Sequence, residues 1–168
     1  MTTQHTDPAP HREDVHPRWL DADQQQLWRA YLEGTVRFVE AISREHDEHS
    51  TVSLNEYELL VRLSESPDHT LRMSALAEGL ARSRSRVTHT VARMEARGLV
   101  RRSASTGDRR GVNCVMTEEG HRTLVEAAPA HVAAVRRFMV DVLTPDQFRA
   151  LGEAMAVVAR ACREDHEI

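Results

Sequence analysis

The chain has 168 residues and a mass of 19.0 kDa, which is the size of one compact domain or one subunit of a small oligomer. Hydrophobic residues make up 40% of it, and no apolar run approaches the ~18–20 residues of a membrane helix, so a disordered chain and a membrane protein are both excluded. Two cysteines and the lack of an apolar leader argue against a secreted disulfide scaffold, and we expect a cytoplasmic, mainly helical protein.

The formal net charge of -4 conceals an uneven distribution of arginine, which supplies all 22 basic residues. Residues 72–110 hold 10 arginines and 3 acids, whereas residues 1–71 carry a net charge of -8 and residues 111–168 one of -3. A basic segment inside an acidic chain predicts contact with a polyanion, most commonly nucleic acid. The alternative is a solvated face whose arginines pair with nearby acids, but the segment itself has too few acids for that.

The first predicted helix follows a tail, residues 1–18, whose prolines, histidines and scarce aliphatic side chains predict disorder. From Trp19 to about Glu48, apolar residues recur at helical spacing in a band that is wide for a surface helix. One side of this helix is therefore expected to be buried against something outside its own domain. The band contains Leu20, Leu27, Trp28, Tyr31, Leu32, Val36, Phe38, Val39 and Ile42.

Three shorter helices are predicted next. Ser53-Leu-Asn-Glu56 is a capping box that begins a helix ending before Pro67, and residues 70–72 form a short extended piece. Ser74 is predicted to cap a brief helix over residues 75–81. After a turn at residues 82–83, another helix runs from about Arg84 to Arg97 and ends at Gly98, a residue type suited to a left-handed C-cap.

A hairpin and two long helices complete the chain. Residues 99–103 and 112–116 are predicted to be strands joined by a Gly-Asp-Arg loop. Thr117 is expected to cap a helix kinked at Pro129, and Thr144-Pro145 to begin the last helix, which runs to about Glu164. The inward residues expected in the first of these helices are Leu124, Val125, Ala128, Val132, Val135, Phe138, Met139 and Val142; the last helix has Phe148, Leu151, Met155, Val158 and Cys162 on one face.

Two helices around a turn, followed at once by a hairpin, indicate a winged helix-turn-helix. Val87, Val91 and Met94 would pack the second helix against Leu76 and Leu80 of the first. The opposite face would hold Arg82, Arg86, His89 and Arg93. Because the major groove accepts one helix and arginine can donate two hydrogen bonds to guanine, this face predicts DNA recognition. The candidate DNA-binding residues are Ser83, Arg84, Ser85, Arg86, Thr88, His89 and Arg93, with Asp108, Arg109 and Arg110 in the hairpin loop.

Asp108 can hold the Arg110 guanidinium in a bidentate pair, which would aim this arginine at the narrow minor groove of A·T-rich DNA. The alternative is an ordinary turn with a local ion pair. The spacing Asp-x-Arg alone is a weak motif. Because it directly follows a helix-turn-helix, it indicates the DNA-contacting wing.

The motifs Leu71–Ala77, Ser83–Val100, Asp108-Arg-Arg-Gly111 and Val115–Gly120 together resemble the MarR family of bacterial transcriptional regulators. The resemblance spans residues 20–163. It implies a mainly α fold in which residues 19–50 and 118–168 form a dimerisation region around a winged domain at 51–117. It also implies a homodimer on a palindromic operator in double-stranded DNA, most often as a repressor. By position, Arg110 resembles the family's minor-groove arginine and Asp108 its partner, while Ser83–His89 resemble its base-reading residues.

The family resemblance further suggests release by a small aromatic or phenolic effector, with Trp28, Tyr31 and Tyr57 as candidate lining residues. Aromatic residues at helical spacing are more often core than ligand site. No cofactor or bound metal is expected.

Three other functions are alternatives to an effector-released regulator. An enzyme is disfavoured because the sequence has no phosphate-binding loop, nucleophile elbow or Cys-His arrangement. A metal-responsive regulator would have to use histidines from the clusters around His46 and His49 or from His121 and His131, but no His-x₃-His pair is present to anchor a zinc ion. A redox-responsive regulator would need a low-pKa thiol at Cys114 or Cys162, and both are expected to be small packed residues.

Overall fold

The computed structural model describes residues 17–104 and 111–164, so the predicted tail lies almost entirely outside the described residues. The chain divides into two units, residues 1–34 and 35–168. Helix α1 (Ala22–His49) begins in the first unit and ends in the second. Its start is fixed by Asp21, whose carboxylate accepts a 2.8 Å hydrogen bond from the Gln24 N–H while Gln24 returns one to the Asp21 N–H. The helix therefore begins three residues later than predicted.

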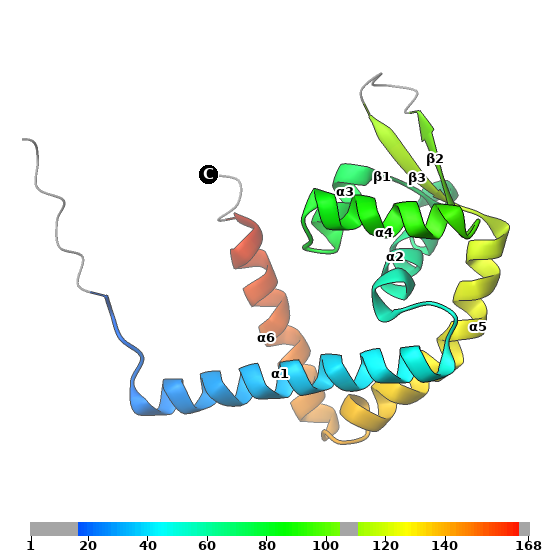
Figure 1. The fold of residues 1–168 in the computed structure, drawn as a ribbon. Coiled ribbons are helices and arrows are strands. Elements are labelled where there is room, and N and C mark those ends of the chain that lie inside the picture. Colours follow the sequence, from blue (N-terminus) through cyan, green and yellow to red (C-terminus); the bar gives the residue numbers. More distant parts are fainter. Residues whose placement is uncertain (1–16, 105–110, 165–168) are drawn as a thin grey trace, which may run out of the picture. The chain divides into compact units, whose positions relative to one another are not determined.

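The second unit has the predicted order of helices and hairpin, and the chain is a mainly α winged helix-turn-helix (Figure 1). A 3₁₀ turn, η1, precedes the first strand, and a π-helical turn, η2, joins the last two helices. The elements after α1 are α2 (Leu54–Ser64), η1 (Pro67–His69), β1 (Thr70–Arg72), α3 (Met73–Gly79), α4 (Arg84–Ala96), β2 (Val100–Ala104), β3 (Val112–Met116), α5 (Glu118–Val135), η2 (Arg136–Val140) and α6 (Pro145–Glu164).

The three strands form one antiparallel sheet in the order β1-β3-β2. The short extended piece predicted at 70–72 is thus a true strand, which pairs Thr70 with Val115. On the other side of β3, Arg102 of β2 lies opposite Cys114. The sheet joins the hairpin to the helix-turn-helix, so the wing is anchored to the same core.

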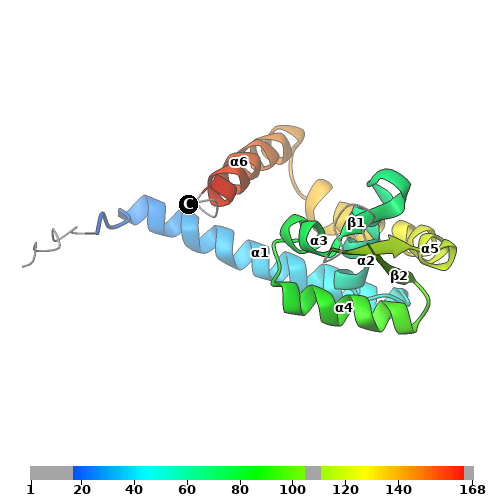
Figure 2. The same ribbon diagram turned by 90° about the horizontal axis from the view of Figure 1, so that it is seen from above.

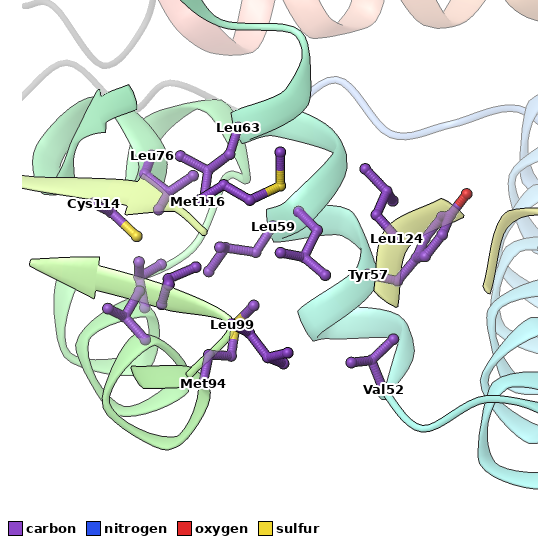
Figure 3. Close-up of a cluster of buried hydrophobic side chains, with 14 of the residues drawn as sticks. Val52, Tyr57, Leu59, Leu63, Leu76, Met94, Leu99, Cys114, Met116 and Leu124 are labelled. Carbon is purple, nitrogen blue, oxygen red and sulfur yellow. The ribbon is translucent and has the colours of Figure 1, made fainter. Parts of the chain in front are cut away.

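The core of the second unit lies around α2 (Figure 3). Leu59 of α2 lies between Cys114 of the sheet on one side and Leu124 of α5 on the other, and Leu63 lies beside Leu76 of α3. The α4 residues predicted to face inward are at most 2% exposed, as is Leu76 of α3; they are Val87, Val91 and Met94. The predicted packing of the two helices is therefore confirmed.

The capping residues predicted at the helix starts differ in outcome. Thr117 accepts from the Gly120 N–H at 3.0 Å, and Thr144 exchanges two hydrogen bonds with Gln147, as predicted. At α2 the predicted capping box is present. Glu56 accepts from the Ser53 N–H at 3.1 Å, and the Ser53 hydroxyl faces the Glu56 N–H without meeting the geometry of a hydrogen bond. The prediction that Ser74 caps α3 is wrong, since β1 continues directly into the helix at Met73.

The apolar faces of the last two helices are less buried than predicted. In α5 and beyond, the side chains expected to point inward at Val125, Val132 and Val142 are 57%, 53% and 69% exposed. Helix α6 has no buried residue within the described chain, although Phe148 and Val158 belong to an apolar face. Proline 129 lies inside α5, which continues to Val135. None of the helices described here is both long and apolar enough to cross a membrane.

Candidate nucleic-acid interface

Helix α4 holds most of the candidate DNA-binding residues, and both views show it beside α3 and the hairpin (Figures 1 and 2). Its first turn is ordered by Ser83, whose hydroxyl accepts from the Arg86 N–H at 3.4 Å. The turn before it includes Ala81, a non-glycine residue at φ 49°. With its apolar face fixed in the core, α4 presents the N-terminal part of its other face to solvent.

Four predicted residues on that face have exposed side chains, and the arginines and the histidine among them have no ion pair to any residue in the described ranges. They are Arg84, Ser85, Arg86 and His89. Thr88 is also exposed, but its hydroxyl donates to the Arg84 carbonyl at 2.8 Å. Two arginines and a histidine are therefore grouped at the N-terminal half of a helix, where the dipole adds positive potential. This arrangement suits guanine edges and phosphate oxygens.

Other arginines of the basic segment are paired, and the prediction that acids are too few to pair with them is wrong in part. The partners come mainly from α2, outside that segment. Arg82 pairs with Glu58 at 2.7 Å, and Arg97 with Glu56 at 3.1 Å. Arg82 is thus held against α2 instead of completing the exposed face. Arg93 lies 3.7 Å from Glu56 but is 66% exposed, so it keeps access to solvent.

Glu56 has a structural role beyond the cap predicted from the sequence. It is 5% exposed and its carboxylate joins the Ser53 N–H to the Arg97 guanidinium. Arg97 also donates to the Thr51 carbonyl at 2.6 Å. These contacts fix the C-terminal end of α4 to the start of α2. Residues 56 and 97 are 41 positions apart, and no local spacing reveals such a pair.

The hairpin loop residues Asp108, Arg109 and Arg110 lie outside the described residues, so their predicted roles stay predictions. The strand that leads to them carries Arg101 and Arg102, which the sequence analysis did not single out. Both are exposed, and Arg102 also reaches α4 and pairs with Glu95 at 3.6 Å. Glu95 therefore pairs with the wing and not with an arginine of its own helix.

The three candidate effector residues fall into two groups. Trp28 and Tyr31 stack on each other in the first unit, with ring centroids 5.6 Å apart. Tyr57, in the second unit, is 6% exposed and packs against His46 and His131, at 4.8 and 4.4 Å. A separate cavity of about 360 Å³ lies between α2, β1 and α3. None of the three aromatic residues lines it; its walls include Arg62, Glu65, Pro67, Leu71, Ala75 and Gly79.

Two of the histidines weighed as metal ligands form a hydrogen-bonded pair that joins α1 to α5. His46 Nδ1 lies 3.3 Å from the Val52 carbonyl, which can only accept, so Nδ1 carries a proton. His46 Nε2 is then the acceptor for His131 Nδ1 at 3.0 Å. Nowhere in residues 17–104 and 111–164 do three His, Cys, Asp or Glu side chains converge as a metal site would require.

The histidine pair makes the fold sensitive to acid. Burial, and to a lesser extent His46, lowers the pKa of His131 from its usual 6.5. His131 in the unfolded chain then binds a proton more readily than His131 in the folded chain. The contribution of neutral His131 to the free energy of unfolding is therefore complete above pH 6.5 and is lost as the pH falls toward the lowered pKa. Between about pH 7.5 and pH 5.5, we expect the wild type to lose more stability in urea unfolding than His131→Gln. An equal loss in both proteins would contradict this.

The two cysteines differ in environment. Burial raises the pKa of the Cys114 thiol to about 12, and its side chain is inaccessible. A redox sensor needs an accessible thiolate, so Cys114 does not fit that role. The expectation that Cys162 is packed is wrong for the single chain, because Cys162 is exposed on α6; it has no disulfide partner among the residues described.

The MarR family model matches residues 52–112, which contain the helix-turn-helix, the strand β2 and the first residue of β3. Two solved structures from Streptomyces coelicolor are similar over nearly the whole chain. Sco3205, a MarR family regulator in complex with DNA, is 41% identical with a TM-score of 0.82, covering 88% of this chain and 92% of its own. AbsC, also a MarR family regulator, is 38% identical with a TM-score of 0.81, covering 88% of this chain and 99% of its own.

A curated relative, the transcriptional repressor MprA of Escherichia coli K12, is 34% identical over 70 residues. That stretch is 42% of this chain and 40% of MprA, so the match spans less than half of the relative. The residues matched by the family model include α4 with its N-terminal arginines and the strand β2.

Proposed function

Because this chain belongs to the MarR family of transcriptional regulators, we propose that it binds a palindromic operator as a homodimer, acts as a repressor and is released by a small-molecule effector. It is a transcriptional regulator and not an enzyme. In this proposal, residues 51–117 bind DNA, and residues 19–50 and 118–168 form the dimer.

The observation that carries the DNA-binding proposal is the group of exposed side chains at the start of α4. Arg84 and Arg86 have no ion pair within the described residues, although the acids of α2 pair with arginines nearby. Arg86 and His89, one turn apart, would contact base edges in the major groove, with Ser85 and Arg84 at the adjacent phosphates. Thr88 and Arg93 would contact the DNA beside them, and Ser83 would set the helix start. Arg110, held by Asp108 and next to Arg109, is proposed to contact the minor groove.

The homodimer proposal is supported by apolar side chains that one chain leaves exposed. In α6, Phe148 is 41% and Val158 is 49% exposed, and in α1, Val36 is 66% exposed. Such faces belong to the helices that flank the winged domain in sequence. A two-fold pair of chains would also place two α4 helices at half-sites about one DNA turn apart.

The repressor and effector proposals have less support. MprA is named a repressor, and its match to this chain spans 70 residues, 40% of MprA. An aromatic or phenolic effector contacting Trp28, Tyr31 or Tyr57 is proposed from the family resemblance. Tyr57 is already packed against two histidines, so a ligand there would have to displace part of that cluster.

Selection of bound fragments from genomic DNA by the purified protein tests the proposal directly. We expect enrichment of one motif made of two inverted half-sites about 10 base pairs apart, centre to centre. Recovery of fragments with no shared motif would contradict sequence-specific binding. Genes beside the recovered sites would identify candidate effectors, which can then be tested for release of the protein from that DNA.

Arg86→Ala is expected to lower affinity for the selected operator by about 5- to 150-fold per half-site, because a bidentate arginine–guanine contact is worth ~1–3 kcal/mol. Fluorescence anisotropy with operator and mutated operator duplexes measures the effect. Arg160→Ala removes the same charge from the exposed surface of α6 and should change affinity less than about twofold. Equal effects of the two substitutions would show that Arg86 acts only through net charge.

A further inference from the structure

Arg102 connects the wing to the recognition helix at two places. Its Nη2 donates to the Thr88 carbonyl at 3.2 Å, and its Nε lies 3.6 Å from Glu95 Oε2. The backbone N–H of the same residue donates to Glu95 Oε1 at 2.9 Å. Residues 88 and 95 are two turns apart in α4, so one strand residue is held along most of the length of the helix.

These contacts use the particular shape of an arginine. The guanidinium has five donors in a planar fork, which allows one side chain to reach a carbonyl and a carboxylate in different directions. Glu95 balances the charge of Arg102 while also accepting its backbone N–H. Arg102 lies opposite Cys114 and therefore on the same face of the sheet as that buried residue, although Arg102 itself stays exposed.

The neighbouring Arg101 is different. It lies on the other face of β2, is exposed and has no ion pair with the described part of the chain. Two adjacent exposed arginines in one strand thus differ in their partners: Arg102 is bound to α4, whereas Arg101 has no ion pair with the described residues.

We propose that Arg102 and Glu95 are a positioning pair that fixes the wing strands relative to the recognition helix, so that both parts meet one half-site in register. This inference rests on the proposed DNA-binding function. If the wing strands and α4 become fixed relative to each other only when DNA binds, affinity for the specific site is lost, because hydrogen bonds to base edges require accurate placement of the side chains. Contact with phosphates tolerates looser placement, so non-specific affinity is unaffected.

The test uses Arg102→Lys, which keeps the charge but removes the fork, and Glu95→Gln, which keeps the shape but removes the charge. Arg101→Lys is the matched control on the same strand. Affinities for the selected operator and for an unrelated duplex of equal length are measured over a range of salt concentrations. We expect both positioning variants to lose about tenfold in the ratio of operator to unrelated-DNA affinity, with the salt dependence unchanged. The control ratio should change less than about twofold.

The ratio separates positioning from a general loss of stability. A partly unfolded variant has less active protein, which lowers both affinities together and leaves the ratio unchanged. An unchanged ratio in both positioning variants would overturn the inference. So would a salt slope for Arg102→Ala that falls by about 0.9 per half-site, because Arg102 would then be a phosphate contact. If the wild type itself does not distinguish the two duplexes, the proposed function fails, and this inference fails with it.

Discussion

Val158→Glu is expected to give a folded protein that elutes as a monomer and binds the operator at least ~100-fold more weakly than the wild type. Val158 is 49% exposed in one chain, on the α6 face that includes Phe148 and Met155. In a two-fold interface, one substitution buries two carboxylates, and each loses water without gaining a cation. A monomer binds one half-site only. In the dimer, binding of one subunit holds the other subunit at a high effective concentration near the second half-site, and the monomer lacks this gain in affinity.

The matched control is Val157→Glu. Val157 is 63% exposed and lies one residue along the helix, about 100° around its axis and away from the apolar face. It introduces the same charge into the same helix, so the two variants should differ only in which face carries the carboxylate. We expect Val157→Glu to remain a dimer with nearly wild-type affinity. Light scattering gives the mass and anisotropy the affinity; a dimeric Val158→Glu protein would contradict the proposed interface.

The order of the elements could be predicted from the sequence because its signals are local. Thr117 and Thr144 begin α5 and α6 through hydrogen bonds that span three residues. Val87, Val91 and Met94 follow the helical period, and all three are in the core. A cap or an apolar spacing that lies within one or two helical turns predicts the element without any information about the residues that pack against it.

The errors arise where a distant partner decides the outcome. The pairing of Arg82 with Glu58 removes a predicted member of the exposed face of α4, and the two residues are 24 positions apart. His46 and His131 meet across 85 positions, and neither has a motif that predicts the other. Val132 has the apolar character and the spacing of a core residue, yet it is 53% exposed. Periodicity identifies an apolar face, but it does not say whether the same chain covers it.

Gly120→Ala is expected to destabilise the folded protein by about 3 kcal/mol, at the upper end of the cost of overpacking a core. Gly120 lies in the first turn of α5, and a Cβ there would be 2.1 Å from the Leu99 carbonyl oxygen. That oxygen cannot move freely, since it accepts from the Thr117 N–H at 3.1 Å and from the Thr117 hydroxyl at 3.0 Å. Alanine must therefore displace the start of α5 from the start of the hairpin.

Gly79→Ala is the control for this prediction, because a Cβ at Gly79 meets nothing within 4 Å. Alanine favours a helix over glycine by up to ~1 kcal/mol, so this variant should be at least as stable as the wild type. Urea unfolding of the three proteins measures the difference directly, and the Gly120→Ala melting temperature should fall by about 10 °C. The same carbonyl joins the cap of α5 to the first residues of the wing. A Gly120→Ala protein as stable as the wild type would contradict this, because the Leu99 carbonyl would then be able to move away from the start of α5 without cost, and the wing would be held by its pairing with β1 and its contacts with α4.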